Sequence, residues 1–201
     1  MLHNLRPHII ISGRDWAAWW ECHGALVPPV LRAEIERESA RLALVKQQVK
    51  AMETKRRQEL ADGKQPLVAQ LSQLRAIGRN GAWVLVKELF GWRRFANRRE
   101  LAGCLGLVPT PYDSGASQTE QGISKAGNKR VRALLVELAW CWLRLQPQSA
   151  LTQWFTSASP AGKRMRRVGI VAMARKLAIT LWRYLQYGEI PAGALLKPAA
   201  V

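Results

Sequence analysis

Apolar residues recur at alternating intervals of three and four along residues 30–52. The members of this seam are Leu31, Ile35, Leu42, Val45, Val49 and Met52. Such alternation is the heptad pattern of a coiled coil, and Glu38 is the position that interrupts it. The pattern predicts one long helix, entered at Pro28-Pro29 and left at Asp62-Gly63. We expect the seam to pair copies of the chain; the alternative is an amphipathic helix that lies on its own domain.

A second apolar pattern covers residues 74–90 and contains two glycines. Leu74 to Ile77 reads as helix, Gly78 to Gly81 as a turn, and Ala82 to Phe90 as the next helix. This order predicts a helix-hairpin-helix-like element, whose exposed N–H groups suit a phosphate contact without base reading. A plain helix–helix corner explains the same residues equally well.

Two longer apolar stripes predict the main helices of the second half. The first helix begins at Asn128, a suitable N-cap, and ends near Leu145. Its apolar stripe consists of Val131, Leu134, Leu135, Leu138, Trp142 and Leu145. The second helix runs from Ile170 to Tyr187, behind a basic loop. Beyond the first dozen residues no useful strand-like alternation appears, so we predict a mainly α fold.

These patterns divide the chain into segments. We expect residues 1–27 to be a remnant or linker and residues 28–62 to be the coiled-coil helix. Residues 63–190 should form a compact helical domain, and residues 191–201 a loosely held tail. A chain of 201 residues that is 48% hydrophobic can bury one ordinary core.

Charge changes this picture, because cations dominate the helical domain. The sequence holds 31 lysines and arginines against 14 acids, a formal net charge of +17. Residues 1–63 carry 10 cations and 8 anions, whereas residues 64–201 carry 21 cations and 6 anions. An imbalance of this size indicates a polyanionic partner, and we expect nucleic acid.

The cations of the helical domain gather in three groups. The first is Arg93, Arg94, Arg98 and Arg99; the second is Lys125, Lys129, Arg130 and Arg132; the third is Lys163, Arg164, Arg166 and Arg167. Only Glu100 lies near the first group in sequence. Its arginines therefore either form a solvated face or meet phosphates.

Cysteine spacing and the N-terminal segment argue against a secreted, zinc-binding or membrane protein. Cys22, Cys104 and Cys141 are odd in number and widely spaced, which supports neither a disulfide framework nor a cysteine zinc site. The isoleucine run at residues 9–11 is too short for a signal sequence or a membrane span. We expect a soluble cytoplasmic protein with no membrane partner.

Several catalytic classes lack the residues that they need. All three histidines lie in the first 23 residues, which disfavours a serine–histidine–aspartate triad. The acids of the basic segment are Glu88, Glu100, Asp113, Glu120, Glu137 and Glu189. No spacing groups these acids for two-metal chemistry, and neither a P-loop nor a dinucleotide fingerprint is present. We expect no metal or cofactor in this chain.

Ser114-Gly115 combines a hydroxyl with a glycine, ahead of a basic helix start. A serine that attacks a phosphate needs cations to withdraw charge, and a loop that lets its oxygen approach in line, which glycine allows. The second basic group supplies charge where the helix dipole already favours an anion. The alternative is a polar surface loop whose cations merely bind DNA.

The stretch "ELAGCLGLVPTPYDSGASQTEQGISKAGNKRVRALLVELAWCWLRLQPQSALTQWF" resembles the C-terminal domain of insertion-sequence transposases of the IS110 type, and more closely their IS1111 branch. The resemblance extends from the heptad helix through the glycine hairpin, the "GLVPTPYDSG" loop and the "GISKAGN" turn to the final "ARKLAITLWRY" helix. These motifs in this order are far more specific than any one of them alone.

The resemblance implies a bacterial DNA recombinase with a serine nucleophile, guided by a structured RNA of its element and forming a transient serine–phosphate bond. The family's serine before glycine corresponds to Ser114; Ser117 is the reserve candidate, and Ser124 fits better as a turn residue. Expected contacts to DNA or phosphate are Lys125, Asn128, Lys129, Arg130, Arg132, Arg93, Arg94, Arg98 and Arg99.

Two departures from the family pattern stand out. Full-length relatives begin with a ribonuclease-H-type domain whose four acids bind magnesium, and nothing before Pro28 can hold such a fold. We therefore expect Mg²⁺ only on that missing domain. The hairpin reads "IGRNGA", with Asn80 where an aliphatic residue is common.

Two alternative functions remain. One is a non-enzymatic DNA- or RNA-binding product; the other is a ribosome-type basic protein, which nine tryptophans disfavour.

Overall fold

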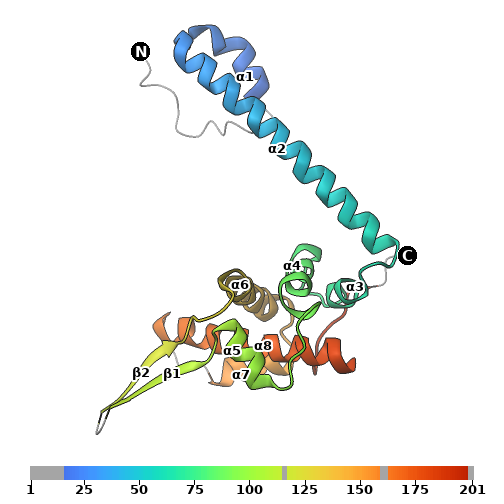
Figure 1. The fold of residues 1–201 in the computed structure, drawn as a ribbon, viewed down its shortest axis with the longest axis vertical. Coiled ribbons are helices and arrows are strands. Elements are labelled where there is room, and N and C mark those ends of the chain that lie inside the picture. The colour runs from blue at the N-terminus through green and yellow to red at the C-terminus, as the bar shows by residue number, and fades with distance from the viewer. Residues whose placement is uncertain (1–15, 115–116, 159–162, 199–201) are drawn as a thin grey trace. The chain divides into compact units, whose positions relative to one another are not determined.

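The computed structural model describes residues 16–114, 117–158 and 163–198. The chain divides into two compact units, Met1–Ala61 and Asp62–Val201 (Figure 1). The fold is mainly α, as predicted from the apolar spacing.

The first unit consists of a long helix and a short one that folds back beside its start (Figure 1). Helix α1 (Trp16–His23) leads through a 3₁₀ turn, η1 (Gly24–Leu26), into the 33-residue helix α2 (Pro29–Ala61). Proline suits the first position of a helix because no intrahelical partner is needed there. Gly63, at φ 70°, follows the end of α2 in the left-handed conformation that glycine favours.

Helix α1 is organised by its aromatic side chains. The ring of Trp16 stacks on those of Trp19 and Trp20, with centroid separations of 5.4 Å in both pairs. The imidazole of His23 lies 5.1 Å from the ring of Trp19. Stacked aromatic pairs each contribute about 0.5–1.5 kcal/mol beyond the area that they bury.

The second unit contains the buried core. Its helices are α3 (Pro66–Ser72), α4 (Arg79–Leu85), the π-helical turn η2 (Val86–Phe90), α5 (Arg98–Leu105), α6 (Lys129–Leu145), α7 (Ala150–Ala158) and α8 (Lys163–Tyr187). Helix α8 packs against α3, α5, α6 and α7, and so forms the centre of the unit. Trp142 and Leu177 are fully buried there. The predicted stripe of α6 is confirmed at Val131, Leu135, Leu138 and Trp142.

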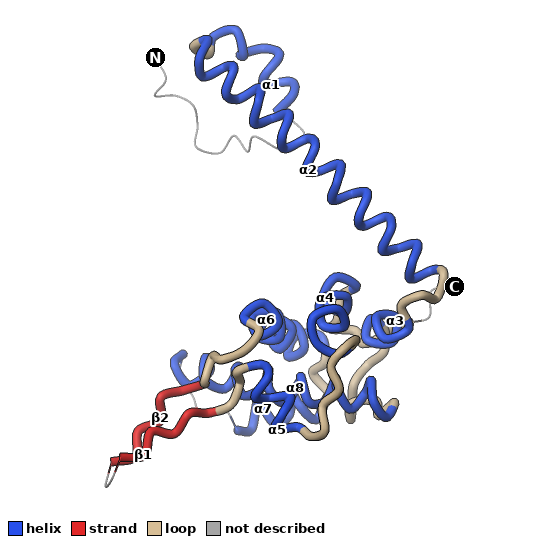
Figure 2. Tube along the Cα trace, in the orientation of Figure 1, coloured by secondary structure: helices blue, strands red, loops and turns tan. Residues whose placement is uncertain are grey.

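An antiparallel β-hairpin joins α5 to α6. Strand β1 (Pro109–Ser114) pairs with β2 (Ser117–Ile123), and the register runs from Pro109 opposite Ile123 to Ser114 opposite Ser117. The two strands extend away from the helices (Figure 2). This hairpin was not predicted from the sequence. Residues 109–114 and 117–123 show no regular alternation of apolar and polar side chains, which is the pattern that predicts a half-buried strand.

The glycine turn is a helix start. Leu74 to Ile77 was expected to be helical, but α3 ends at Ser72. Gly78 is the N-cap of α4, and Gly81 lies within that helix. A Cβ on Gly81 would lie 3.6 Å from a methyl carbon of Leu138, an ordinary van der Waals contact, so Gly81 faces α6. The predicted second helix is present, but it changes to π-helical geometry at Val86.

The C-terminal tail is tied to the unit as far as Lys197, contrary to the expectation of a loosely held segment. Leu196 forms a β-bridge with Leu74, and the Lys197 amide donates to the Gln73 carbonyl at 2.7 Å. The side-chain amide of buried Gln146 donates to the Leu195 carbonyl and accepts from the Leu195 amide. The bond from Lys197 satisfies a carbonyl just beyond the end of α3, and the Gln146 side chain satisfies both backbone groups of Leu195.

The last helix is also longer than predicted. Helix α8 begins at Lys163, not at Ile170, so the segment that was expected to be a basic loop forms its first turns. Four cations within five residues do not prevent helix formation, since lysine and arginine have good helix propensity. The third basic group is therefore displayed on a helix.

Candidate nucleic-acid interface

The turn between the hairpin and α6 is fixed on the end of α5. The Ser124 amide donates to the Val108 carbonyl at 2.9 Å, and the Lys125 amide donates to the Gly106 carbonyl at 3.1 Å. A Cβ on Gly127 would collide with the Cys104 carbonyl oxygen. The contact therefore requires glycine at position 127, which explains a glycine inside the "GISKAGN" turn.

Lys125 has a left-handed backbone conformation with φ 56°, the only such non-glycine residue in the described part of the chain. Its side chain is exposed. This conformation costs a residue with a Cβ about 1–2 kcal/mol. Strain of this kind gathers at functional sites, where the surrounding structure maintains it. Here the amide bond to Gly106 and the close packing of Gly127 hold the turn in place.

Asn128 caps α6, as predicted. Its Oδ1 accepts from the amides of Arg130, at 3.0 Å, and Val131, at 3.1 Å. Its Nδ2 donates to a carboxylate oxygen of Glu88 at 3.0 Å. Because both ends of the side-chain amide are engaged, Asn128 acts here by positioning the helix start that carries Lys129 and Arg130.

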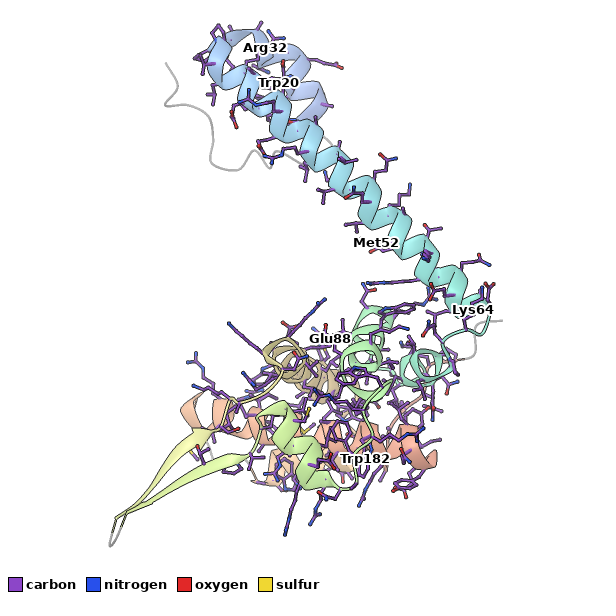
Figure 3. All side chains as sticks on the ribbon, viewed as in Figure 1. Trp20, Arg32, Met52, Lys64, Glu88 and Trp182 are labelled. Atoms are coloured by element: carbon purple, nitrogen blue, oxygen red, sulfur yellow. The ribbon has the colours of Figure 1, made fainter. Side chains whose placement is uncertain are left out.

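Glu88 was not predicted as a site residue. It comes from η2 and lies near the start of α6, where its carboxylate accepts from Asn128 and pairs with a guanidinium nitrogen of Arg130 at 3.1 Å (Figure 3). Glu88 is half-buried, whereas the Arg130 side chain is 73% exposed. In the sequence, the only feature that could have pointed to Glu88 is that it is one of few acids in a basic segment.

The second basic group divides by role. Lys125, Lys129 and Arg130 are exposed. Arg132 is half-buried, and its guanidinium donates to the Leu105 carbonyl at 3.1 Å. Arg132 therefore ties α6 to the C-terminal end of α5, leaving the other three cations accessible to an anion.

The first basic group lies around the start of α5. Asn97 caps this helix by accepting from the amides of Arg99 and Glu100, and the Glu100 carboxylate accepts from the Ala96 amide. All four arginines, Arg93, Arg94, Arg98 and Arg99, are exposed. Since the Glu100 carboxylate faces the turn, it leaves most of this charge uncompensated.

Arg93 links the two basic groups. Its guanidinium lies 4.4 Å from the ring centroid of Trp92 and donates to the Cys104 sulfur at 2.9 Å. A hollow of about 470 Å³ opens beside it and reaches the α6 start at Gly127 and Asn128. The structure thus brings the residues around α5 and those of α6 to one surface.

The candidate serines lie at the other end of the hairpin. Ser114 ends β1, Ser117 begins β2, and the two are paired in the register. Their side chains and Gly115 are outside the described part of the structure. Lys125 lies near the hairpin base, whereas Ser114 is five residues along the strand from Pro109. At about 3.3 Å per residue, this separates Ser114 from the base by roughly 17 Å.

The third basic group is partly described. Arg166 and Arg167 are exposed near the start of α8, and the guanidinium of Arg166 lies 5.3 Å from the ring centroid of Trp140. The side chains of Lys163 and Arg164 lie outside the described residues.

Among the residues that the structure describes, no three His, Cys, Asp or Glu side chains are grouped to hold a metal ion. Within the same residues, no helix is long and apolar enough to cross a membrane.

Comparison with known proteins places these features in a family. A model of the transposase IS116/IS110/IS902 family matches residues 68–154, which include both candidate serines and the first two basic groups. Through this part, the chain is similar to the transposases of that family. The resemblance inferred from the sequence motifs is confirmed.

Curated relatives extend the match beyond that segment. The Sinorhizobium fredii protein y4rJ, named as a transposase, is 41% identical over 186 residues, which are 87% of this chain and 47% of the relative. The transposase for insertion sequence element IS1328 of Yersinia enterocolitica is 29% identical over 166 residues, 82% of this chain and 48% of the relative. The transposase for insertion sequence element IS1111A of Coxiella burnetii is 33% identical over 97 residues, 48% of this chain and 26% of the relative. The chain spans about half the length of the first two relatives.

Proposed function

We propose that this chain is the serine-bearing part of a DNA transposase that cuts and exchanges DNA strands through a transient phosphoserine. The observation that carries the proposal is the family match over residues 68–154, within which Ser114 and the exposed cations occur together. Relatives named as transposases of insertion sequences support an activity on DNA.

The proposed reaction has two transfers. The Ser114 oxygen attacks a DNA phosphorus, forming a serine–phosphate ester and breaking the bond to a sugar oxygen, which takes up a proton. The serine proton passes to water or to a base outside this chain. A sugar hydroxyl of another strand then attacks the phosphoserine, joins that strand and regenerates the serine. Energy is retained in the ester, so the exchange needs no nucleotide cofactor.

We infer that Ser114 and the cations at the start of α6 contact different phosphates of the DNA, because the hairpin separates them. Ser114 lies roughly 17 Å along the hairpin from the hairpin base. The base, and not Ser114, lies near Lys125 and the α6 start. Phosphates of one DNA strand are about 3.4 Å apart along the helix axis, so this separation equals about five steps. We infer that Lys125, Lys129 and Arg130 bind the backbone several nucleotides from the attacked phosphate, and so position the duplex.

Further partners belong to the same proposal. A structured guide RNA would bind the basic surfaces, and copies of the chain would associate through residues 30–52. Mg²⁺ would be held by acidic residues of a nuclease-like domain supplied outside this chain. The exposed seam on α2 supports the association of copies, and the cationic surface of the second unit supports both nucleic acids.

A covalent-trapping experiment tests the serine. The chain is combined with a separately supplied acidic domain and a suicide DNA substrate, and protein–DNA adducts are separated under denaturing conditions. We expect an adduct with the unaltered chain, and its loss in Ser114→Ala with duplex binding retained. Ser124→Ala is the matched control, since this turn serine should leave the adduct intact.

Each other outcome has a defined meaning. An adduct that survives Ser114→Ala and disappears in Ser117→Ala moves the nucleophile to Ser117. Strand transfer by the variant that lacks both hydroxyls would refute the phosphoserine mechanism. Binding without any adduct or strand transfer would favour a non-enzymatic nucleic-acid-binding product, for which the exposed cations suffice.

A further inference from the structure

Trp92 is a large apolar side chain exposed within a cationic surface. Its exposed fraction is 63%, and the Arg93 guanidinium lies 4.4 Å from its ring centroid. Leaving an indole in water forgoes the free energy that its burial would provide. Electrostatic binding of a duplex backbone needs arginines and no aromatic ring, so the position of Trp92 calls for another explanation.

Two adjoining hollows meet at Trp92, and together we call them the Trp92 hollow. They have volumes of about 470 Å³ and 420 Å³ and share Trp92, Arg93 and Cys104. The first is also lined by Glu88, Ala126, Gly127 and Asn128, and the second by Arg94, Phe95 and Glu100. Volumes of this order fall in the range of small-molecule sites, about 300–1,000 Å³.

The acids in the Trp92 hollow do not oppose an anionic ligand strongly. Glu88 is engaged by Asn128 and Arg130, and Glu100 accepts from the Ala96 amide. Arg93 and Arg94 are exposed residues of the hollow, so both cations can meet an anion. A flat aromatic surface, a hollow of nucleotide size and two cations therefore occur together.

We propose that the Trp92 hollow binds an unpaired nucleotide, with its base stacked on Trp92 and its phosphates at Arg93 and Arg94. In a duplex the bases are stacked on each other and present no free face, whereas a single strand offers one at every base. Arginine beside an aromatic ring adds to such a stack. The inference rests on the proposed function, because it names the form of nucleic acid that this part of the surface recognises.

Binding measurements with paired variants test the proposal. The probes are oligothymidylate about 12 nucleotides long, within the site sizes of single-strand binders, its RNA counterpart, and a DNA duplex of equal length. Trp92→Ala should weaken single-strand binding by about tenfold or more, as expected for one lost stacking contact, and duplex binding by less than twofold. Trp92→Phe should restore most of the single-strand affinity.

Trp140 provides the matched control. It is 38% exposed and also has an arginine beside its ring, Arg166 at 5.3 Å, but it lines neither part of the Trp92 hollow. Trp140→Ala should change neither affinity by more than twofold. Oligonucleotides carrying 5-iodouracil should crosslink to the tryptic peptide of residues 88–93, which contains Trp92, rather than to the peptide of residues 133–144, which contains Trp140.

The outcomes separate this inference from the proposed function. Equal loss of single-strand and duplex binding in Trp92→Ala, or crosslinks outside residues 88–93, would overturn the inference. Duplex binding with no single-strand binding would overturn it as well, while leaving the proposed function standing. If the unaltered chain bound no form of nucleic acid, the proposed function itself would fail. If Trp92→Ala did not fold, the crosslink map and Trp92→Phe would still decide.

Discussion

At the scale of single residues, the turn at Lys125 shows how a charged side chain is displayed at a cost. Its amide is bonded to Gly106, and its backbone is held in a left-handed conformation. Glycine would adopt this conformation without the clash of a Cβ, yet a lysine occupies it. The strain is consistent with a side chain retained for contact with phosphate.

Replacing Lys125 by glycine should therefore separate stability from binding. The variant removes about 1–2 kcal/mol of strain, while the greater freedom of glycine in the unfolded chain costs about 0.5–1 kcal/mol. We expect thermal unfolding to show a small rise in Tm, of a few degrees at most, together with weaker duplex binding. Lys129→Ala is the control for charge alone, because it removes a cation of the same surface without relieving backbone strain, and it should weaken duplex binding. A lower Tm in Lys125→Gly would contradict the strain argument.

At the scale of elements, the sequence patterns correctly predicted the features that depend on local side-chain bonding or on a buried helix face. The Asn128 cap and the buried stripe of α6 follow from side-chain bonding to free amides and from helical spacing. The hairpin was missed because its strands show no alternation of apolar and polar residues, and the α4 start was misread because a glycine pair also suits a turn. The bonds between Gln146 and Leu195 join residues 49 apart, so no local pattern could reveal the attachment of the tail.

The candidate site divides in the same way. Cationic residues and the Ser114-Gly115 pair are visible as residue types, and the family resemblance gives them an order. Their spacing is not visible, because the length of the hairpin sets the distance between serine and cations. Glu88 and Trp92 were missed as well, since their importance arises from contacts with α5 and α6 rather than from neighbours in sequence.

Helix α2 has an apolar seam without any buried residue in the described unit. Val45, Val49 and Met52 have exposed fractions of 52%, 44% and 53%. Salt bridges such as Arg32–Glu36 and Arg37–Glu34 flank it along the helix. An exposed stripe at heptad spacing predicts pairing with the same stripe on a second copy.

The double variant Leu42→Asp with Val49→Asp should consequently reduce the assembled mass. Two carboxylates in the seam would have to be desolvated on pairing, so sedimentation velocity should show a smaller particle. The matched control is Leu44→Asp with Ala51→Asp. It has the same seven-residue spacing, adds the same two carboxylates and costs at least as much helix propensity, but lies off the seam. Equal masses for both double variants would instead support packing of α2 within one chain.

At the scale of the whole molecule, nearly all of the excess positive charge lies in the second unit. Of the net +17, residues 1–63 contribute little, with 10 cations and 8 anions. On α2 several arginines are paired with glutamates, whereas the arginines around α5 are exposed with few acids nearby. Equal losses of formal charge should thus have unequal effects, depending on the unit from which the charge is removed.

This difference can be measured through the salt dependence of duplex binding. Log affinity should fall linearly with log salt, with a slope of about 0.9 for each phosphate neutralised, because each contact releases a counterion. Arg98→Gln with Arg99→Gln removes two exposed cations from the start of α5. The slope should therefore decrease by up to about 1.8. Arg32→Gln with Arg37→Gln removes the same charge from glutamate-paired positions on α2 and should leave the slope unchanged. If the two double variants reduced the slope equally, net charge rather than the surface around α5 would control binding, and the assignment of the interface would be wrong.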